Sequence, residues 1–168
     1  IRDVLIIGGS KIAVYLAEEL IKSGVNVKII EQKLEKCRAL SERLPSAVII
    51  NGDGTLQDLL SSEGIEETDA VISLTNIDEE NLVISMYADS CGVPKSITKI
   101  NRTEYLRLFK DRDIGSVICP KMLASYEIIR YVRAMDNTTG GSVKTMYRIV
   151  DEKVEALEFA VTDSTKCI

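Results

Sequence analysis

The sequence VLIIGGSKIA, residues 4–13, contains the clearest structural signal in the chain. Its first four residues are apolar, which is typical of a strand buried on both faces of a sheet. Two glycines end this strand, and apolar residues then recur at helical spacing over residues 12–23, up to Gly24. A buried strand, a glycine turn and a helix in succession predict a βαβ unit with a parallel sheet.

The same alternation continues along the chain. Further strands are expected at residues 25–30, 47–50, 70–74, 96–100 and 116–119. Helices are expected at residues 34–44, 78–89 and 104–110, with a short one capped by Thr55. Six strands separated by single helices predict an α/β fold with a doubly wound parallel six-stranded sheet.

The pattern changes after Pro120. Residues 121–135 predict one amphipathic helix, residues 136–142 have the polar, glycine-rich composition of a linker, and residues 146–150 and 154–161 predict a hairpin. We expect an α/β domain at 1–135, a linker at 136–142 and a truncated α+β segment at 143–168. Because the chain starts at Ile1 without Met, we also expect it to be a fragment of a longer protein.

Composition excludes several classes of function. The chain has 168 residues, 45% hydrophobic and 28% charged, so it can bury a core, but it has no His for acid–base or nucleophile chemistry. A formal charge of −5 and 5% aromatic residues disfavour nucleic acid as a partner. No apolar run approaches the ~18 residues of a membrane span. Cys37, Cys91 and Cys119 are expected to be small core residues, as in a cytoplasmic protein.

The glycine turn predicts a dinucleotide-binding site. Gly8 occupies the first position of the fingerprint, and Ser10 and Ala13 occupy the two positions where further glycines are usual. The phosphates would lie at the N-terminus of the following helix, where unpaired N–H groups favour anions. The Ser10 hydroxyl can also hydrogen-bond a phosphate oxygen.

Glu31 follows Gly8 by 23 residues and ends the second expected strand. A carboxylate there can accept hydrogen bonds from both hydroxyls of an adenosine ribose and would repel a 2′-phosphate. This favours NAD(H) or an adenine nucleotide (ATP, ADP or AMP) over NADP(H). The alternative is a solvated charge that opens the next helix.

Other polar residues follow later strands, where open α/β sheets bind ligands. Asp53 could accept from an adenine amino group or only form a turn with Thr55, and Thr75 with Asn76 could flank the diphosphate or form an Asx turn. Lys99 and Arg102 could offer positive charge or be surface cations. Lys11 could reach the distal phosphates of ADP or ATP, or be a solvated residue at a helix start. The expected cofactor-binding set is Gly8, Gly9, Ser10, Lys11, Ile12, Glu31, Asp53, Gly54, Leu74, Thr75 and Lys99, with no catalytic and no metal-binding residue.

Three motifs extend this pattern: GDGT at 52–55, LTNIDEEN at 74–81 and PKMLASYEII at 120–129. With the glycine turn, they resemble the TrkA-N domain, the nucleotide-binding part of regulators of potassium conductance (RCK or KTN domains). The resemblance covers residues 1–135, and the segment after Gly140-Gly141 resembles the start of the TrkA-C domain. Members of the TrkA family carry two such units in tandem, and the second often begins with a double-glycine turn. With this turn and without a starting Met, the chain resembles a fragment of the second unit. Ser10 and Ala13 depart from the family, which usually has glycines there.

The resemblance implies a Rossmann-like fold followed by a crossover helix. It implies a cytoplasmic regulatory subunit, peripheral to the inner face of the plasma membrane, that gates a potassium transporter or channel. NAD(H) or adenine nucleotides would be bound and not consumed, and the crossover helix would pair two copies into at least a dimer.

One rival is the cofactor half of an NAD-dependent oxidoreductase. However, the sequence has no His and no Tyr-x-x-x-Lys arrangement near the sheet, so we expect no enzyme activity. Another rival is a ligand-free assembly module with the same fold.

Overall fold

The computed structural model describes residues 1–109, 115–136, 143–149 and 154–159. The chain divides into two compact units, residues 1–120 and 121–168. The first unit contains one parallel sheet of six strands with the order β3-β2-β1-β4-β5-β6. Its strands are β1 (Asp3–Ile7), β2 (Asn26–Glu31), β3 (Val48–Asn51), β4 (Ala70–Ser73), β5 (Lys95–Lys99) and β6 (Ser116–Ile118). The predicted Rossmann-like sheet is therefore confirmed.

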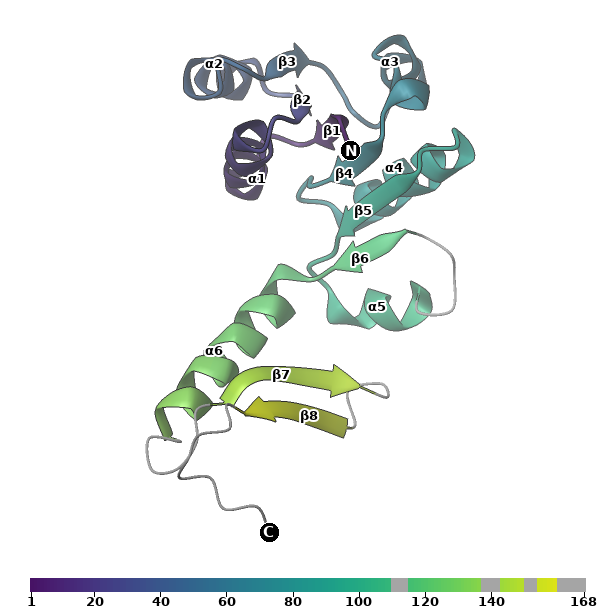
Figure 1. Cartoon of the computed structure of the whole chain (residues 1–168). Coiled ribbons are helices and arrows are strands. Elements are labelled where there is room, and N and C mark those ends of the chain that lie inside the picture. The colour runs from purple at the N-terminus through teal and green to yellow at the C-terminus, as the bar shows by residue number, and fades with distance from the viewer. Residues whose placement is uncertain (110–114, 137–142, 150–153, 160–168) are drawn as a thin grey trace. The chain divides into compact units, whose positions relative to one another are not determined.

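Helices cover both faces of this sheet, α1 and α2 on one side and α3 and α4 on the other (Figure 1). Their bounds are α1 (Lys11–Lys22), α2 (Leu34–Arg43), α3 (Gln57–Ser62), the 3₁₀ helix η1 (Ile65–Glu67), α4 (Asp78–Ser90) and α5 (Thr103–Phe109). Alternate residues of the central strands enter two separate cores, so Ile6 packs toward α1 while Leu5 and Ile7 pack toward the opposite face. Near-continuous apolar runs in β1, β2 and β4 follow from this double burial.

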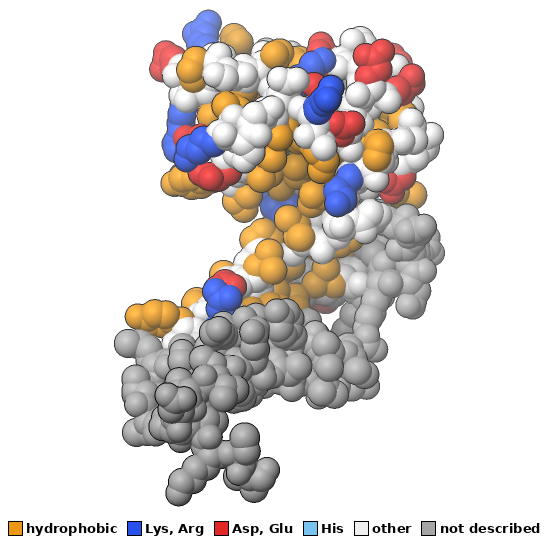
Figure 2. All heavy atoms as spheres, in the orientation of Figure 1, with side chains coloured by type: hydrophobic (Ala, Val, Ile, Leu, Met, Phe, Trp, Pro, Cys, Tyr) orange, Lys and Arg blue, Asp and Glu red, His pale blue; other side chains and the backbone are white. Residues whose placement is uncertain are grey.

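Charged side chains of both signs are interspersed over the part of the first unit that Figure 2 shows, without a basic patch on that face. Within the described residues, no helix is long and apolar enough to cross a bilayer. The same part of the chain contains no cluster of His, Cys, Asp or Glu residues that could hold a metal ion.

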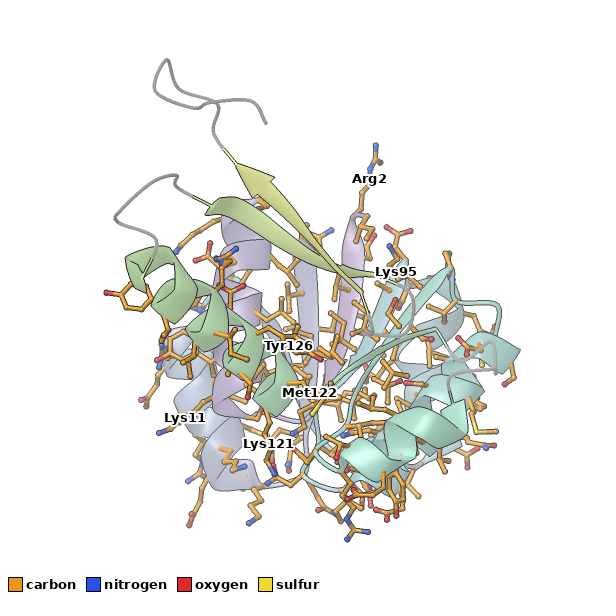
Figure 3. The ribbon with its side chains drawn as sticks, turned by 90° about the horizontal axis from the view of Figure 1, so that it is seen from below. Arg2, Lys11, Lys95, Lys121, Met122 and Tyr126 are labelled. Atoms are coloured by element: carbon orange, nitrogen blue, oxygen red, sulfur yellow. The ribbon has the colours of Figure 1, made fainter. Side chains whose placement is uncertain are left out.

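The strand order reverses between β1 and β4. The chain runs outward from β1 to β3, returns to the other side of β1 at β4, and continues outward to β6. Figure 3 shows Arg2, which precedes β1, and Lys11, which follows it, at opposite ends of the sheet. Ile7 is in register with Ile30 of β2 and with Ser73 of β4. The loops after these strands therefore meet at one edge, where open α/β sheets bind ligands.

The second unit contains α6 (Pro120–Asp136) and an antiparallel pair, β7 (Val143–Ile149) with β8 (Val154–Phe159). This pairing confirms the expected hairpin strands. Asp136, the first residue of the predicted linker, ends α6, and β7 begins three residues before the predicted strand 146–150. Residues 137–142 of the linker, residues 151–153 of the hairpin turn, and residues 150 and 160–161 of the predicted strands lie outside the described residues. The compact units place almost all of α6 with the C-terminal part, whereas the sequence assigned residues 121–135 to the first domain.

Two local expectations are corrected. Thr55 does not cap the following helix, because α3 begins at Gln57. Its N-cap is therefore Leu56, which has no side-chain cap hydrogen bond. The backbone instead makes a turn in which Leu56 N–H donates to the carbonyl of Asp53. Cys37 and Cys119 are buried as expected, but Cys91, at the C-terminal end of α4, is only half-buried.

Candidate functional site

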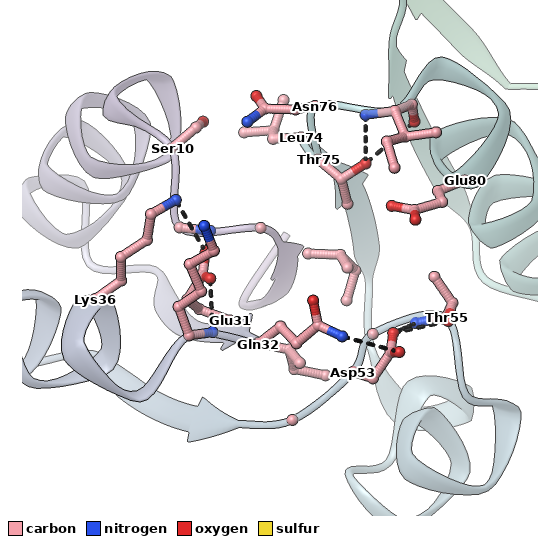
Figure 4. Close-up of a pocket in the computed structure, with 18 residues that line it drawn as sticks. Ser10, Glu31, Gln32, Lys36, Asp53, Thr55, Leu74, Thr75, Asn76 and Glu80 are labelled. Carbon is pink, nitrogen blue, oxygen red and sulfur yellow. Dashed lines mark hydrogen bonds and ion pairs between the residues drawn. The ribbon is translucent and has the colours of Figure 1, made fainter.

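A pocket of about 270 Å³ lies at the C-terminal edge of the sheet, where the strand order reverses (Figure 4). The loops after β1, β2, β3 and β4 all contribute to its wall. Eight of the expected residues line it: Gly8, Gly9, Ser10, Glu31, Asp53, Gly54, Leu74 and Thr75. The strand ends thus bring together residues that are up to 67 positions apart in the sequence.

Gly8 makes the tight turn that the fingerprint predicts. Its φ is +99°, a conformation that residues with a Cβ rarely adopt. A Cβ on Gly8 would also lie 3.0 Å from the backbone C and O of Leu74 and from the backbone N of Thr75. The turn after β1 therefore packs directly against the loop after β4, and only glycine satisfies both restrictions.

Gly9 is restricted by neighbouring side chains and not by its φ angle. Its N–H donates to Glu31 Oε2 at 2.8 Å. A Cβ on Gly9 would lie 2.6 Å from Leu40 Cδ1 and 3.0 Å from the same carboxylate oxygen. The glycine turn and the carboxylate at the end of β2 are thus in direct contact.

Ser10 is the N-cap of α1, and its Oγ accepts from Ala13 N–H at 3.3 Å. Its hydroxyl hydrogen remains able to donate to a ligand oxygen. Ala13 is fully buried against the sheet, in agreement with the close helix–strand packing expected at the third fingerprint position.

Lys11 and Ile12 open α1, and their backbone N–H groups have no acceptor within the helix. Their side chains do not line the pocket. The Ile12 side chain is exposed. The Lys11 side chain instead lines a neighbouring groove between α1 and α2, with Tyr15 and Arg43.

Glu31 is buried, with 7% of its surface exposed, so it is not a solvated charge. Its Oε1 accepts from Lys33 N–H at 2.8 Å, and Lys36 Nζ lies 3.7 Å from Oε2. Each carboxylate oxygen has room for a further hydrogen bond in addition to its backbone amide. The geometry leaves Glu31 able to accept from a hydroxyl pair within the pocket.

Asp53 forms the turn that the sequence offered as one alternative, and it also lines the pocket. Its Oδ1 accepts from the Thr55 N–H at 3.0 Å and from the Thr55 hydroxyl at 2.7 Å. Gln32 Nε2 donates to Oδ2 at 3.2 Å. The two bonds from Thr55 hold the pKa of the Asp53 carboxyl below its ordinary value, so the pocket keeps this negative charge.

The loop after β4 forms the opposite wall. Leu74 is buried, and its N–H donates to the carbonyl of Ile7 at 2.8 Å. Thr75 Oγ1 accepts from Ile77 N–H at 3.2 Å, which gives a side-chain turn before α4. Asn76 also lines the pocket, which is compatible with the alternative that Thr75 and Asn76 lie beside a diphosphate.

Lys99 and Arg102 do not line this pocket. Lys99 ends β5 and is buried, and this loss of hydration lowers the pKa of its ammonium group while the charge of Asp78 opposes the shift. Arg102 is exposed and donates to Glu79 Oε1 at 3.3 Å and to the Tyr105 hydroxyl at 3.0 Å.

Gln32, Lys36 and Glu80 line the pocket but were not in the expected set. Glu80 lies in the first turn of α4, and Lys36 lies in the first turn of α2. Both helices follow strands whose C-terminal ends form the pocket. The first turns of the helices that follow β2 and β4 are therefore the signal that would have identified Lys36 and Glu80, whereas Gln32 lies in the loop before α2.

Known proteins share this sequence pattern. Residues 4–120 match the family model described as the TrkA-N domain. The Trk system potassium uptake protein TrkA of Halomonas elongata is 37% identical over 167 residues, 99% of this chain and 36% of that protein. Trk system potassium uptake protein trkA homolog 1 of Methanosarcina mazei is 31% identical over 98% of this chain and 39% of its own length. The chain thus spans a little over a third of these relatives.

Solved structures share the fold at lower identity. The TrkA-N domain of inner membrane protein ybaL from Escherichia coli has a TM-score of 0.69 at 15% identity, covering 78% of this chain and 96% of that one. The Kef CTD of Shewanella denitrificans in AMP-bound form has a TM-score of 0.65 at 13% identity, covering 81% and 82%. The GsuK channel bound to NAD has a TM-score of 0.63 at 16% identity, covering 89% and 26%.

Proposed function

The chain belongs to the TrkA-N domain family, and from that premise we propose that it is a nucleotide-sensing regulatory domain of a potassium uptake system. The contact between the glycine turn and Glu31 carries the proposal, because it combines a phosphate site and a ribose acceptor in one pocket. Support comes from relatives named Trk system potassium uptake proteins and from neighbouring folds solved with NAD or AMP.

The proposed ligand is NAD(H) or an adenine nucleotide (ATP, ADP or AMP). Glu31 accepts from the ribose hydroxyls, while the amides of Lys11 and Ile12 with the Ser10 hydroxyl bind the phosphates. Asp53 accepts from the adenine amino group, beside Gly54. The side chain of Lys11 reaches distal phosphates that extend beyond the pocket.

The Leu74–Thr75 wall faces the diphosphate or the second ribose in this proposal. Lys99 contributes positive charge from behind this wall rather than from the pocket surface, since it does not line the pocket. No residue of the pocket is assigned to catalysis.

We further propose how binding is transmitted. A ligand that fits one conformation better than another shifts the population toward that conformation. Pairing of two copies through α6, into at least a dimer, would carry the shift to a membrane-embedded potassium transporter or channel subunit. In this proposal the domain works in the cytoplasm, at the inner face of the plasma membrane.

A thermal-shift panel with NADH, NADPH, ADP, ATP and AMP tests the proposal. NADH or at least one adenine nucleotide is expected to raise the melting temperature, and NADPH is not, because the Glu31 carboxylate repels a 2′-phosphate. NADH absorbance followed in the same samples should stay constant. The absence of any shift would favour a ligand-free assembly module, and consumption of NADH with an added substrate would favour an oxidoreductase.

A further inference from the structure

Asn81 is a fully buried amide on α4 to which the proposed site assigns no role. Its Oδ1 accepts from Thr75 N–H at 2.8 Å. Its Nδ2 donates to the carbonyl of Thr75 at 3.1 Å and to the carbonyl of Lys99 at 3.0 Å. One side chain therefore holds both backbone polar groups of Thr75 and ties them to the end of β5.

Thr75 is the residue through which this amide reaches the pocket. Thr75 lines the pocket, whereas Asn81 does not. The backbone N of Thr75 lies 3.0 Å from the point that a Cβ on Gly8 would occupy, so it packs against the glycine turn. A displaced Thr75 would change the width of the pocket between the glycine turn and the loop after β4.

The neighbouring loop has a separate anchor. The carboxylate of Asp78, one turn before Asn81, accepts from the N–H of Asn101 at 2.9 Å and from the N–H of Arg102 at 2.8 Å. Loss of Asn81 alone leaves this anchor in place. A substitution at Asn81 therefore acts mainly on the loop that lines the pocket.

We propose that Asn81 is a positioning residue for the nucleotide site: it fixes Thr75 against the glycine turn, so that the wall facing the phosphates is preset before a ligand binds. This inference rests on the proposed function, because the benefit is measured as nucleotide affinity. When the loop is already ordered, the free energy of binding is not reduced by the entropy lost in ordering it.

Asn81→Ala, compared with Ser85→Ala, tests this role. Ser85 lies one helical turn later on α4, is also fully buried, and hydrogen-bonds the hydroxyls of Ser73 and Thr98, away from the pocket. It controls for the loss of a buried polar group from the same helix. Calorimetric titration with NADH, ADP and ATP gives the affinities, and amide hydrogen exchange reports the Thr75 N–H.

Asn81→Ala is expected to weaken binding at least about tenfold, equivalent to ~1.4 kcal/mol. It should also speed exchange at the Thr75 amide. Ser85→Ala is expected to lower the melting temperature without either effect. If Asn81→Ala does not fold, Asn81→Asp serves instead. It keeps the acceptor for Thr75 N–H but turns a carboxylate oxygen toward two carbonyls, so the same weakening is expected.

Three results would overturn the inference. Equal weakening by Ser85→Ala would show a general loss of stability. An unchanged affinity in a folded Asn81 variant would show that nucleotide binding does not depend on the position in which Asn81 holds Thr75. If the parent binds no probe at all, the proposed function fails, and the inference fails with it. The parent titration therefore distinguishes failure of the function from failure of the inference alone.

Discussion

Gly8 and Ser10 belong to the same turn, but we expect substitutions at the two residues to have opposite effects on nucleotide binding. Gly8→Val should abolish nucleotide binding, because the positive φ and the backbone of Leu74 both exclude a β-branched side chain. Ser10→Gly loses the hydroxyl contact to the phosphates, but it keeps every backbone amide and lets a phosphate approach the backbone more closely, so binding should be preserved or improved. It should cost only a few tenths of a kcal/mol of stability as a cap replacement.

The thermal-shift panel, run on both variants, measures this pair of effects. Circular dichroism of Gly8→Val establishes that the variant is folded. Parent-like binding by a folded Gly8→Val would rule out this turn as the phosphate site.

Glu31 is expected to set the preference between cofactors. In Glu31→Gln the side chain keeps its shape and one acceptor for Gly9 N–H but loses its charge. The ratio of the NADPH dissociation constant to that of NADH should therefore fall, because the repulsion of the 2′-phosphate is removed. Glu80→Gln, which removes the charge of another carboxylate lining the pocket, should leave the ratio close to that of the parent.

Asp53 gives the site a pH dependence with a defined sign. The Thr55 hydrogen bonds depress the pKa of this carboxyl in the folded state. The resulting stabilisation is present above the unfolded-state pKa and is lost as the pH falls through the folded-state pKa. Urea denaturation should show the parent more stable than Asp53→Asn at neutral pH, with the difference shrinking below about pH 4. A constant difference across this range would contradict the assignment.

At the scale of elements, the start of α4 holds the loop that follows β5. Asp78 is buried, and its carboxylate accepts from the backbone of Asn101 and Arg102 and from Asn101 Nδ2 at 2.9 Å. Asp78→Ala should lower the free energy of unfolding by about 1.5–3 kcal/mol, because these donors lose a charged acceptor in a site with little water.

Glu79→Ala is the matched control for this substitution. Glu79 is the next residue on α4, but it is exposed, and its Oε1 accepts from the side chains of Arg102 and Tyr105. Exposed pairs of this kind contribute little to stability, because water screens the two charges. Urea denaturation of both variants should separate them, and equal losses would argue against the loop anchor.

At the scale of the whole molecule, α6 exposes an unusual amount of apolar surface. Leu123, Ile128, Tyr131 and Val132 are each more than half exposed, and Figure 2 shows hydrophobic side chains along this helix. Contiguous apolar surface of this kind usually marks an interface. Ile129 on the same helix is half-buried, and Ile128 is the more exposed of the two.

Ile128→Glu is therefore expected to convert a dimer into monomers, because it would place a charge in the interface without a partner. Light scattering coupled to size-exclusion chromatography measures the mass. Val48→Glu, an exposed apolar residue of β3, should leave the mass unchanged. A monomeric parent at high concentration would refute pairing through α6.

The order and type of most elements in the first unit follow from the amino-acid sequence alone. Each strand and helix buries one or both of its faces in the core. The apolar runs and the helical periodicity that result can be read within the sequence of each element. The same local signals identified Gly8, Ser10 and Ala13 at the turn and Glu31 at the end of β2, since spacing along one βαβ unit fixes these positions. The 3₁₀ helix at Ile65–Glu67 left no such signal, because it has only three residues.

Which side chains meet in the pocket depends on the tertiary structure. The contact of Gly9 with Glu31 and the hydrogen bond from Asn81 Nδ2 to the carbonyl of Lys99 depend on how the strand ends align, which is a relation between segments far apart in the sequence. For the same reason Lys36 and Glu80 reach the pocket, while Lys99 and Arg102 do not. Adjacent strands bring the first turns of α2 and α4 to the switch point, whereas β5 lies one strand farther along the sheet.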